Sequence, residues 1–247
     1  MHSRMVTYRL PDIHYEAPKL DVPDPPAGMS YLSFGEYCNA ELLKLNGIEC
    51  SEPALLDVFM HPSDPILLAA SAHTFGALGM TAGVASLRQA LTASDDHVVV
   101  EAAYALARLG YKEGNAALVA CLGRPVPPYL SPLFSAGYLA QLGDPRGFAV
   151  VVNALGLEAL DARMLACKQL FFFLPFHGER DAGGATMDVV AQFERMLNHS
   201  DPALQWQALA QLRETRSPAF VDAVRRYVGR APNTAFGGVA QALLDKL

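Results

Sequence analysis

The sequence predicts an all-α fold, a stack of about six helical hairpins followed by one C-terminal capping helix. A pattern recurs about every 32 residues along most of the chain. Within each repeat a small residue precedes a Leu or Phe by four positions, which places both on one face of a helix. A fixed period of this length is typical of stacked units rather than of one central core. The repeats start at Leu32, Asp64, Asp95, Pro128, Leu160, Asp201 and Asn233.

The first helix of each repeat is predicted from these starting positions. The small residue stands seven positions after the start, and the Leu or Phe stands eleven positions after it. Ser63-Asp64-Pro65 and Ser200-Asp201-Pro202 are good helix starts, because a capping side chain precedes a first-turn proline. Glycines fifteen positions after four of the starts indicate helix ends that need a positive φ. The small residues are Asn39, Ser71, Ala102, Ser135, Cys167, Ala208 and Ala240; the apolar residues are Leu43, Phe75, Leu106, Leu139, Phe171, Leu212 and Leu244; the glycines are Gly47, Gly79, Gly110 and Gly143.

A second helix follows in each of the first six repeats. Its apolar residues stand twenty-three and twenty-seven positions after the start, as Leu55 and Phe59 do in the first repeat. In the fifth repeat an insertion displaces them to Phe193 and Leu197. One hairpin cannot bury both of its faces, so neighbouring hairpins must stack. The seventh repeat has only a first helix, which we expect to cap the stack.

Three stretches of the chain resemble the HEAT-repeat family. They are Asp64-Pro65…Phe75-Gly76-Ala77-Leu78-Gly79, Asp95…Ala102-Ala103…Leu109-Gly110 and Leu142-Gly143-Asp144-Pro145. The chain is most similar to the short repeats of phycobilin lyases and many bacterial proteins, over residues 30–247. The resemblance implies a right-handed α-α superhelix whose second helices line a concave surface. The chain departs from the family pattern at Leu68 and Val99, where a basic residue often follows the opening Asp.

Two segments do not fit the repeat. Residues 1–28 contain five prolines, which preclude a long helix and favour extended chain. We predict an N-terminal arm here and a repeat domain at 29–247. The arm is a flexible tail, a cover for the first hairpin or a docking peptide for a partner.

The second irregular segment is an insertion loop at about 176–187, after three consecutive phenylalanines. Successive helical residues point about 100° apart, so these three rings cannot share one buried face. Two interpretations stay open. The core is repacked locally, or Phe176 and His177 belong to a ligand or partner site, since long loops in compact arrays are often functional.

Composition excludes several classes of protein. The net charge is −6, which disfavours general nucleic-acid binding because that binding neutralises phosphates. No apolar stretch is long enough to span a membrane, and Met1 to Leu10 lacks the apolar run of a secretory signal. The cysteines show no CxxC spacing. We therefore expect a cytoplasmic protein with reduced thiols, bound neither to nucleic acid nor to a membrane.

No motif predicts chemistry, so we expect no catalytic residue, metal or cofactor. Phosphate-binding loops and the GxSxG elbow are absent. His177-Gly178-Glu179 has the HxE shape of zinc deaminases but lacks their PCxxC partner. Cys167 occupies a small-residue position of the repeat, which favours a packing role.

Polar residues on the second helices are the best candidates for function. Two positions beyond the first core residue, a side chain points about 200° away from the core. In the family these positions face the concave groove, which here is acidic at Asp57 and basic at Arg226. Arg213, Arg216, Arg225 and Arg230 reinforce the basic end. The candidate partner-binding residues are Asp57, Gln89, Asn153, Arg195, Arg226, Phe176, His177 and Trp206.

The favoured function is a non-catalytic scaffold or adaptor that binds another protein on the concave surface. A graded groove would orient an oppositely polarised partner and raise its association rate. Two alternatives stay open. One is a bilin-lyase-like enzyme or enzyme subunit, the activity known in the family. The other is a neutralising partner of a toxin or secreted effector.

Overall fold

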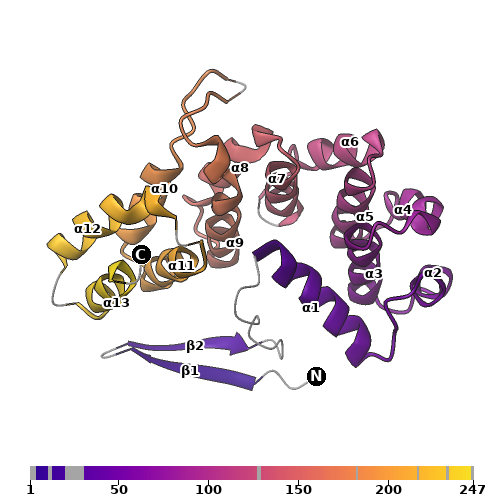
Figure 1. Ribbon diagram of the computed structural model, residues 1–247, viewed down its shortest axis with the longest axis horizontal. Coiled ribbons are helices and arrows are strands. Elements are labelled where there is room, and N and C mark those ends of the chain that lie inside the picture. Colours follow the sequence, from indigo (N-terminus) through magenta and orange to yellow (C-terminus); the bar gives the residue numbers. More distant parts are fainter. Residues whose placement is uncertain are drawn as a thin grey trace. The chain divides into compact units, whose positions relative to one another are not determined.

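The computed structural model confirms the all-α repeat fold (Figure 1). It describes residues 4–10, 13–19, 31–126, 129–181, 183–215, 217–231 and 234–245. Within them, consecutive helices form six hairpins and a final single helix. The helices are α1 (Tyr31–Leu45), α2 (Glu52–Met60), α3 (Pro65–Ala77), α4 (Val84–Ala90), α5 (Asp96–Arg108), α6 (Lys112–Cys121), α7 (Ser131–Gln141), α8 (Phe148–Ala154), α9 (Leu160–Leu170), α10 (Val189–Leu197), α11 (Pro202–Thr215), α12 (Val221–Arg230) and α13 (Ala235–Leu244).

Short 3₁₀ helices lead into several of the second helices. Three of them directly precede α4, α8 and α12, so the backbone is wound more tightly just before these second helices begin. A fourth follows α9 and contains the three consecutive phenylalanines. They are η1 (Thr81–Gly83), η2 (Pro145–Gly147), η3 (Phe171–Phe176) and η4 (Pro218–Phe220).

The N-terminal segment contains extended chain, as its prolines predict. Strands β1 (Arg4–Leu10) and β2 (Ile13–Lys19) pair antiparallel, from Arg4 opposite Lys19 to Leu10 opposite Ile13. The other residues of the predicted 1–28 arm lie outside the described part of the chain. Whether the arm covers the first hairpin or docks a partner stays a prediction.

The chain divides into two compact units. Pro25–Ala154 form one, called here the α1–α8 unit. Met1–Asp24 and Leu155–Leu247 form the other, the α9–α13 unit. In each, successive first helices pack directly on one another: α1 on α3, α3 on α5 and α5 on α7, then α9 on α11 and α11 on α13.

The core confirms the register of the repeat. The predicted small residues from Ser71 to Ala240 are completely buried, as are most of the predicted Leu and Phe residues of the first helices. In the second helices, Leu55, Leu87, Leu118, Val151, Phe193 and Val224 are also completely buried. Each residue buried in this way contributes about 1.5–3 kcal/mol when it is a large aliphatic or aromatic side chain.

The predicted helix ends are also confirmed. The carboxylate of Asp64 accepts a hydrogen bond from the Ile66 amide at 2.8 Å, and that of Asp95 accepts from the His97 amide at 2.9 Å. Gly79 ends α3 with a φ of 68°, in the left-handed region that glycine adopts without strain.

The α1–α8 unit bends toward its first helices. Figure 1 shows α2, α4 and α6 on the outer side of the bend and α3, α5 and α7 on the inner side. On the inner side, α3 and α5 approach closely, since a Cβ added at Gly76 would lie 2.6 Å from the Cα of Ala105. The family resemblance implies the opposite, with second helices on the inner side, and that expectation is wrong for this unit.

The three consecutive phenylalanines are accommodated by the switch from α9 to the 3₁₀ helix η3. Phe171 and Phe173 are buried. The Phe171 ring lies 6.1 Å from Phe193 and 5.4 Å from Phe220 between ring centroids. In a 3₁₀ helix, positions i and i+2 are about 120° apart around the axis, against about 160° in an α-helix, so the first and third rings diverge less. Local repacking of the core therefore explains this sequence.

Candidate functional site

The predicted second-helix residues all lie on the surface. Asp57 on α2, Gln89 on α4, Asn153 on α8, Arg195 on α10 and Arg226 on α12 are exposed. The helical geometry behind the prediction therefore holds. The first three belong to the α1–α8 unit and the last two to the α9–α13 unit, so a single graded groove from Asp57 to Arg226 stays a prediction.

The two arginines of the α9–α13 unit belong to neighbouring helices. Helices α10 and α12 pack together, and the Arg226 Nε donates a hydrogen bond of 2.7 Å to the Glu194 carboxylate. Glu194 directly precedes Arg195 in sequence. The structure thus brings Arg195 and Arg226 onto adjoining helices, with Glu194 tying the two helices together.

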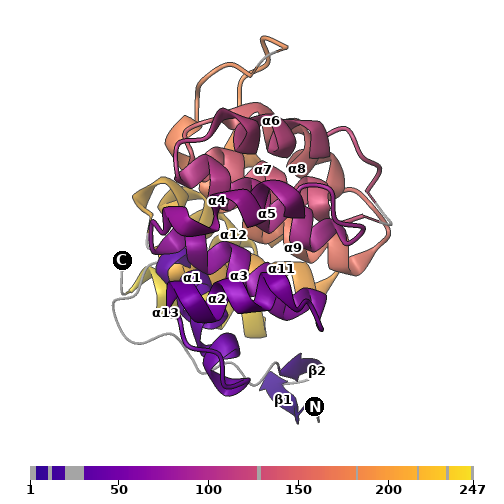
Figure 2. The same ribbon diagram turned by 90° about the vertical axis from the view of Figure 1, so that its right-hand side faces the viewer.

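Phe176 and His177 stand at the base of an ordered insertion loop. The Phe176 ring is half-buried, 6.4 Å from Phe173, and the His177 imidazole lies 3.8 Å from the Asp188 carboxylate. The amide of Gly178 donates to the Met187 carbonyl at 3.0 Å, so the two sides of the loop are paired. Figures 1 and 2 both show the loop projecting beyond the helices next to it.

The tip of this loop is held by Asp181. Its carboxylate accepts hydrogen bonds from the amides of Gly183 and Ala185, both at 2.9 Å. Trp206, the remaining predicted residue, is half-buried on α11 rather than part of the loop. Whether the loop or Trp206 contacts a partner stays a prediction.

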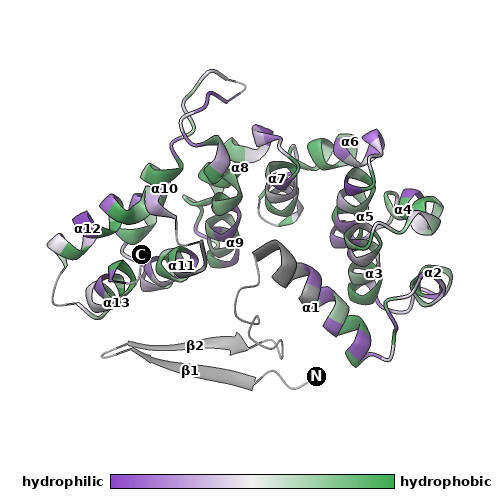
Figure 3. Cartoon of the chain, viewed as in Figure 1, coloured by the Kyte–Doolittle hydropathy of each residue, from purple (hydrophilic) through white to green (hydrophobic). Residues whose placement is uncertain are grey.

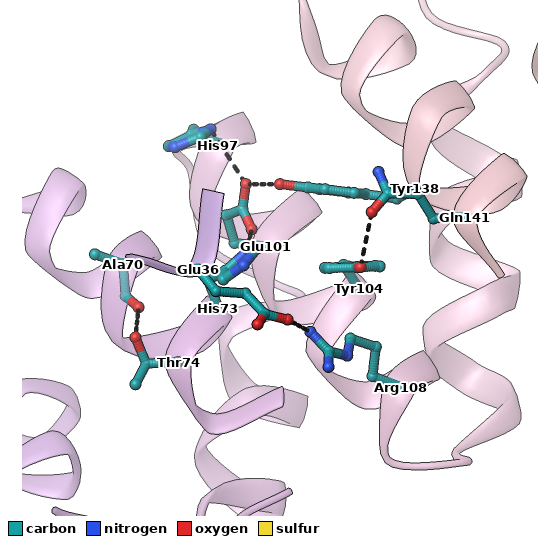
Figure 4. Close-up of polar contacts among 10 residues, drawn as sticks. All are labelled: Glu36, Ala70, His73, Thr74, His97, Glu101, Tyr104, Arg108, Tyr138 and Gln141. Carbon is teal, nitrogen blue, oxygen red and sulfur yellow. Dashed lines mark hydrogen bonds and ion pairs between the residues drawn. The ribbon is translucent and has the colours of Figure 1, made fainter. Parts of the chain in front are cut away.

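A buried polar network that sequence reasoning missed crosses three first helices of the α1–α8 unit (Figure 4). His73 on α3 lies 2.8 Å from the Glu101 carboxylate on α5, through its Nδ1. The hydroxyl of Tyr138 on α7 donates to the other oxygen of Glu101 at 2.5 Å. The side chains of His73 and Glu101 are only 4% and 5% exposed, so this ion pair is shielded from solvent.

Aromatic stacking extends the network. The rings of Tyr104 and Tyr138 are parallel, with centroids 3.9 Å apart, and the Tyr104 hydroxyl donates to Gln141 at 3.1 Å. Arg108 lies over the Tyr104 ring and pairs with Glu36 on α1 (Figure 4). On α5, Glu101, Tyr104 and Arg108 share the side opposite the core residues Ala102 and Leu106, since helix positions three and four apart lie on one face.

Two pKa values reflect this environment. Burial raises the pKa of Glu101, but the hydrogen bond and charge of His73, the charge of His97 and the Tyr138 hydroxyl outweigh burial and hold it below its ordinary value. Burial raises the pKa of Tyr104 to about 12. Glu101 is therefore ionised and Tyr104 is protonated at neutral pH.

The network is suited to holding helices rather than to reacting with a ligand. Both oxygens of Glu101 are occupied, by His73 and Tyr138. Nε2 of His73 is buried and has no hydrogen-bond partner among the described residues. The signal in the sequence was Glu101 itself, a single acid inside the apolar run from Val98 to Ala103.

The lowered pKa of Glu101 predicts how stability depends on pH. The stabilisation by the ionised carboxylate is fully present above the unfolded-state pKa, about 4.5, and is lost as the pH falls through the folded-state value. We expect urea unfolding between about pH 7 and about pH 3 to show that the wild type loses stability faster than Glu101→Gln as the pH falls. The difference between their free energies of unfolding should therefore become smaller. A constant difference over this range would contradict the assignment.

Two shallow hollows lie at the N-terminal ends of first helices. One of about 410 Å³ is lined by Asp64 and Asp95, and one of about 310 Å³ by Asp96, His97 and Phe134. Within the described part of the chain, no cluster of three or more His, Cys, Asp or Glu side chains could hold a metal ion. Among the same residues, no helix has the length and apolar character needed to span a membrane.

Comparison with known proteins supports the repeat assignment. A family model for HEAT repeats matches residues 52–131. The chain is similar in structure to the CpcE–CpcF complex of phycocyanin lyase from Nostoc sp. PCC7120, with 18% identity and a TM-score of 0.42 over 94% of this chain and 98% of that chain.

Two further solved structures are similar to the chain. Human deoxyhypusine hydroxylase in complex with glycerol shares 15% identity with a TM-score of 0.37, over 87% of this chain and 79% of that chain. An engineered protein shares 17% identity with a TM-score of 0.43, over 88% and 92%. No curated protein sequence matches the chain.

Proposed function

We propose that this chain, which matches a HEAT-repeat family model over residues 52–131, is a non-catalytic scaffold that binds another protein through its second helices. One observation carries the proposal. Two positions beyond the first core residue, five of the six second helices present an exposed polar side chain and α6 presents the exposed Ala120, whereas the equivalent residues of the first helices α3, α5, α7 and α9 are buried. Repeats of this kind hold a row of contact residues in fixed positions, which lowers the entropic cost of binding.

The distribution of polar groups favours the second helices over the first. The polar residues of α3 and α5 are buried: His73, Glu101 and Tyr104 are 4%, 4% and 2% exposed, and His73 is hydrogen-bonded to Glu101. Asp57 and Arg226, by contrast, have side chains that are 68% and 56% exposed. Groups that are already paired and buried have little to offer a partner, whereas exposed charges can steer and orient one.

We place the protein in the cytoplasm. Cys38, Cys50, Cys121 and Cys167 are free thiols, with Cys121 and Cys167 buried. Burial raises the pKa of the Cys167 thiol, so it is an unreactive packing residue. Unpaired cysteines are the usual state in a reducing compartment.

The test is affinity capture from an extract of the source cells, with quantitative mass spectrometry. The wild type should retain a specific protein. Recovery of that protein should fall at least about tenfold in one of two double variants, Asp57→Arg with Asn153→Arg or Arg195→Glu with Arg226→Glu. The reason is that a reversed or added charge opposes a complementary partner. Circular dichroism should stay helical in both.

The control is Lys44→Glu with Lys168→Glu. Both lysines are exposed on first helices, α1 and α9, and the net-charge change equals that of the double arginine variant. Recovery by this variant should match the wild type. Unchanged recovery by both test variants would overturn the proposed second-helix surface.

A further inference from the structure

The α9–α13 unit carries a surface on which four exposed arginines outnumber the neighbouring acidic residues. The four residues are exposed on the adjoining helices α10 and α12, and are called here the arginine face: Arg195, Arg225, Arg226 and Arg230. Figure 3 shows α12 with hydrophilic positions alternating with hydrophobic ones, as expected for an amphipathic surface helix. Its apolar side is buried through Ala223, Val224 and Tyr227.

The acidic side chains beside this face only partly neutralise it. Arg226 pairs with Glu194 at 2.6 Å and Arg225 pairs with Asp222 at 3.1 Å. Within the described part of the chain, Arg195 and Arg230 have no ion-pair partner. Two guanidinium groups therefore remain available, and their planar donor forks bind carboxylates in a bidentate manner.

A glycine lies within the arginine face without a structural reason of its own. Gly229 is exposed in the last turn of α12, its φ is not in the left-handed region, and a Cβ added there would meet nothing within 4 Å. Glycine is disfavoured relative to alanine inside a helix. It stands three residues after Arg226 and four after Arg225, so it leaves bare backbone beside both.

We propose that the arginine face binds an acidic segment of the partner protein, whose chain approaches α12 closely at Gly229. This rests on the proposed scaffold function and names the chemistry of the partner. Arg226 and Arg230 are one helical turn apart, about 6 Å along the axis, and Arg226 uses only part of its five N–H donors on Glu194, through Nε and Nη2. Carboxylates at every second position of an extended segment are about 6.6 Å apart, which matches that spacing.

The test uses fluorescein-labelled decaglutamate as the probe, with fluorescence anisotropy at low salt. The wild type should bind it, with an affinity that falls as salt is added. Arg195→Glu with Arg230→Glu should weaken binding at least about tenfold. The charge-matched Lys44→Glu with Lys168→Glu should weaken it less than about threefold.

Gly229 gives a second, independent readout. Gly229→Leu should weaken decaglutamate binding without lowering the midpoint of thermal unfolding, because its side chain projects into open space and leucine is the better helix former. Gly229→Ala should bind more tightly than Gly229→Leu. Equal binding by the wild type and Gly229→Leu would overturn the close approach.

Other outcomes overturn the inference as a whole. They are no decaglutamate binding, binding unaffected by Arg195→Glu with Arg230→Glu, or tighter binding of a labelled RNA decamer than of decaglutamate. The scaffold function would survive these outcomes if Asp57→Arg with Asn153→Arg still abolished capture of a cellular partner. The two proposals therefore fail separately.

Discussion

Replacing Glu101 by alanine should lower the free energy of unfolding by about 3–5 kcal/mol, the usual loss when one member of a buried ion pair is removed. The substitution leaves the His73 Nδ1 and the Tyr138 hydroxyl without their partner inside the protein. It also removes the carboxylate that joins α3, α5 and α7. Urea unfolding followed by circular dichroism, at neutral pH, measures the change.

Two variants make this result specific. Glu101→Gln keeps an acceptor for one neighbour and should lose less stability than Glu101→Ala. Glu113→Ala removes an exposed partner of Arg88, whose side chain is 52% exposed, and should cost far less stability than Glu101→Ala, because solvent screens a surface pair. A similar loss from Glu101→Ala and Glu113→Ala would mean that the buried network contributes no more than a surface pair.

This network shows what the sequence could not predict. The repeat relates equivalent positions, so it predicted that Ala102 and Ser135 would be buried in neighbouring first helices. His73 and Glu101 are 28 residues apart, and Glu101 and Tyr138 are 37 apart. One separation is shorter than the period of about 32 residues and the other is longer, so the three residues do not occupy equivalent positions in their repeats. Which side chains meet depends on the rotation and offset of each helix.

The candidate binding surface on the second helices was predicted only in part, again because the repeat period does not describe how particular helices pack. Two positions beyond a core residue, helical geometry alone makes Asp57 or Arg195 point to solvent, and both are exposed. The direction in which the α1–α8 unit bends depends on the packing of whole helices against one another, which periodicity does not describe. Gly76 lies close to Ala105, so α3 and α5 approach each other tightly on the inner side. The second helices therefore lie on the outer side there.

The register of the whole repeat can be tested at Ala102. Ala102→Arg should lower the free energy of unfolding by more than about 4 kcal/mol, which is the scale of an unpaired charge or a severe steric clash in a core. Ala102 is completely buried on α5 and belongs to the same core as Leu87 and Leu106. A typical domain is stable by only about 5–15 kcal/mol, so much of the α1–α8 unit should be unfolded.

The matched control is Ala120→Arg, the same substitution at an exposed position of α6. Arginine is a good helix former, so this variant should stay within about 0.5 kcal/mol of wild type. Thermal unfolding by circular dichroism compares the two, and Trp206 fluorescence reports on the α9–α13 unit at the same time. Because small side chains at this position let neighbouring first helices approach, a normal cooperative transition in Ala102→Arg would contradict the close packing on which the repeat assignment depends.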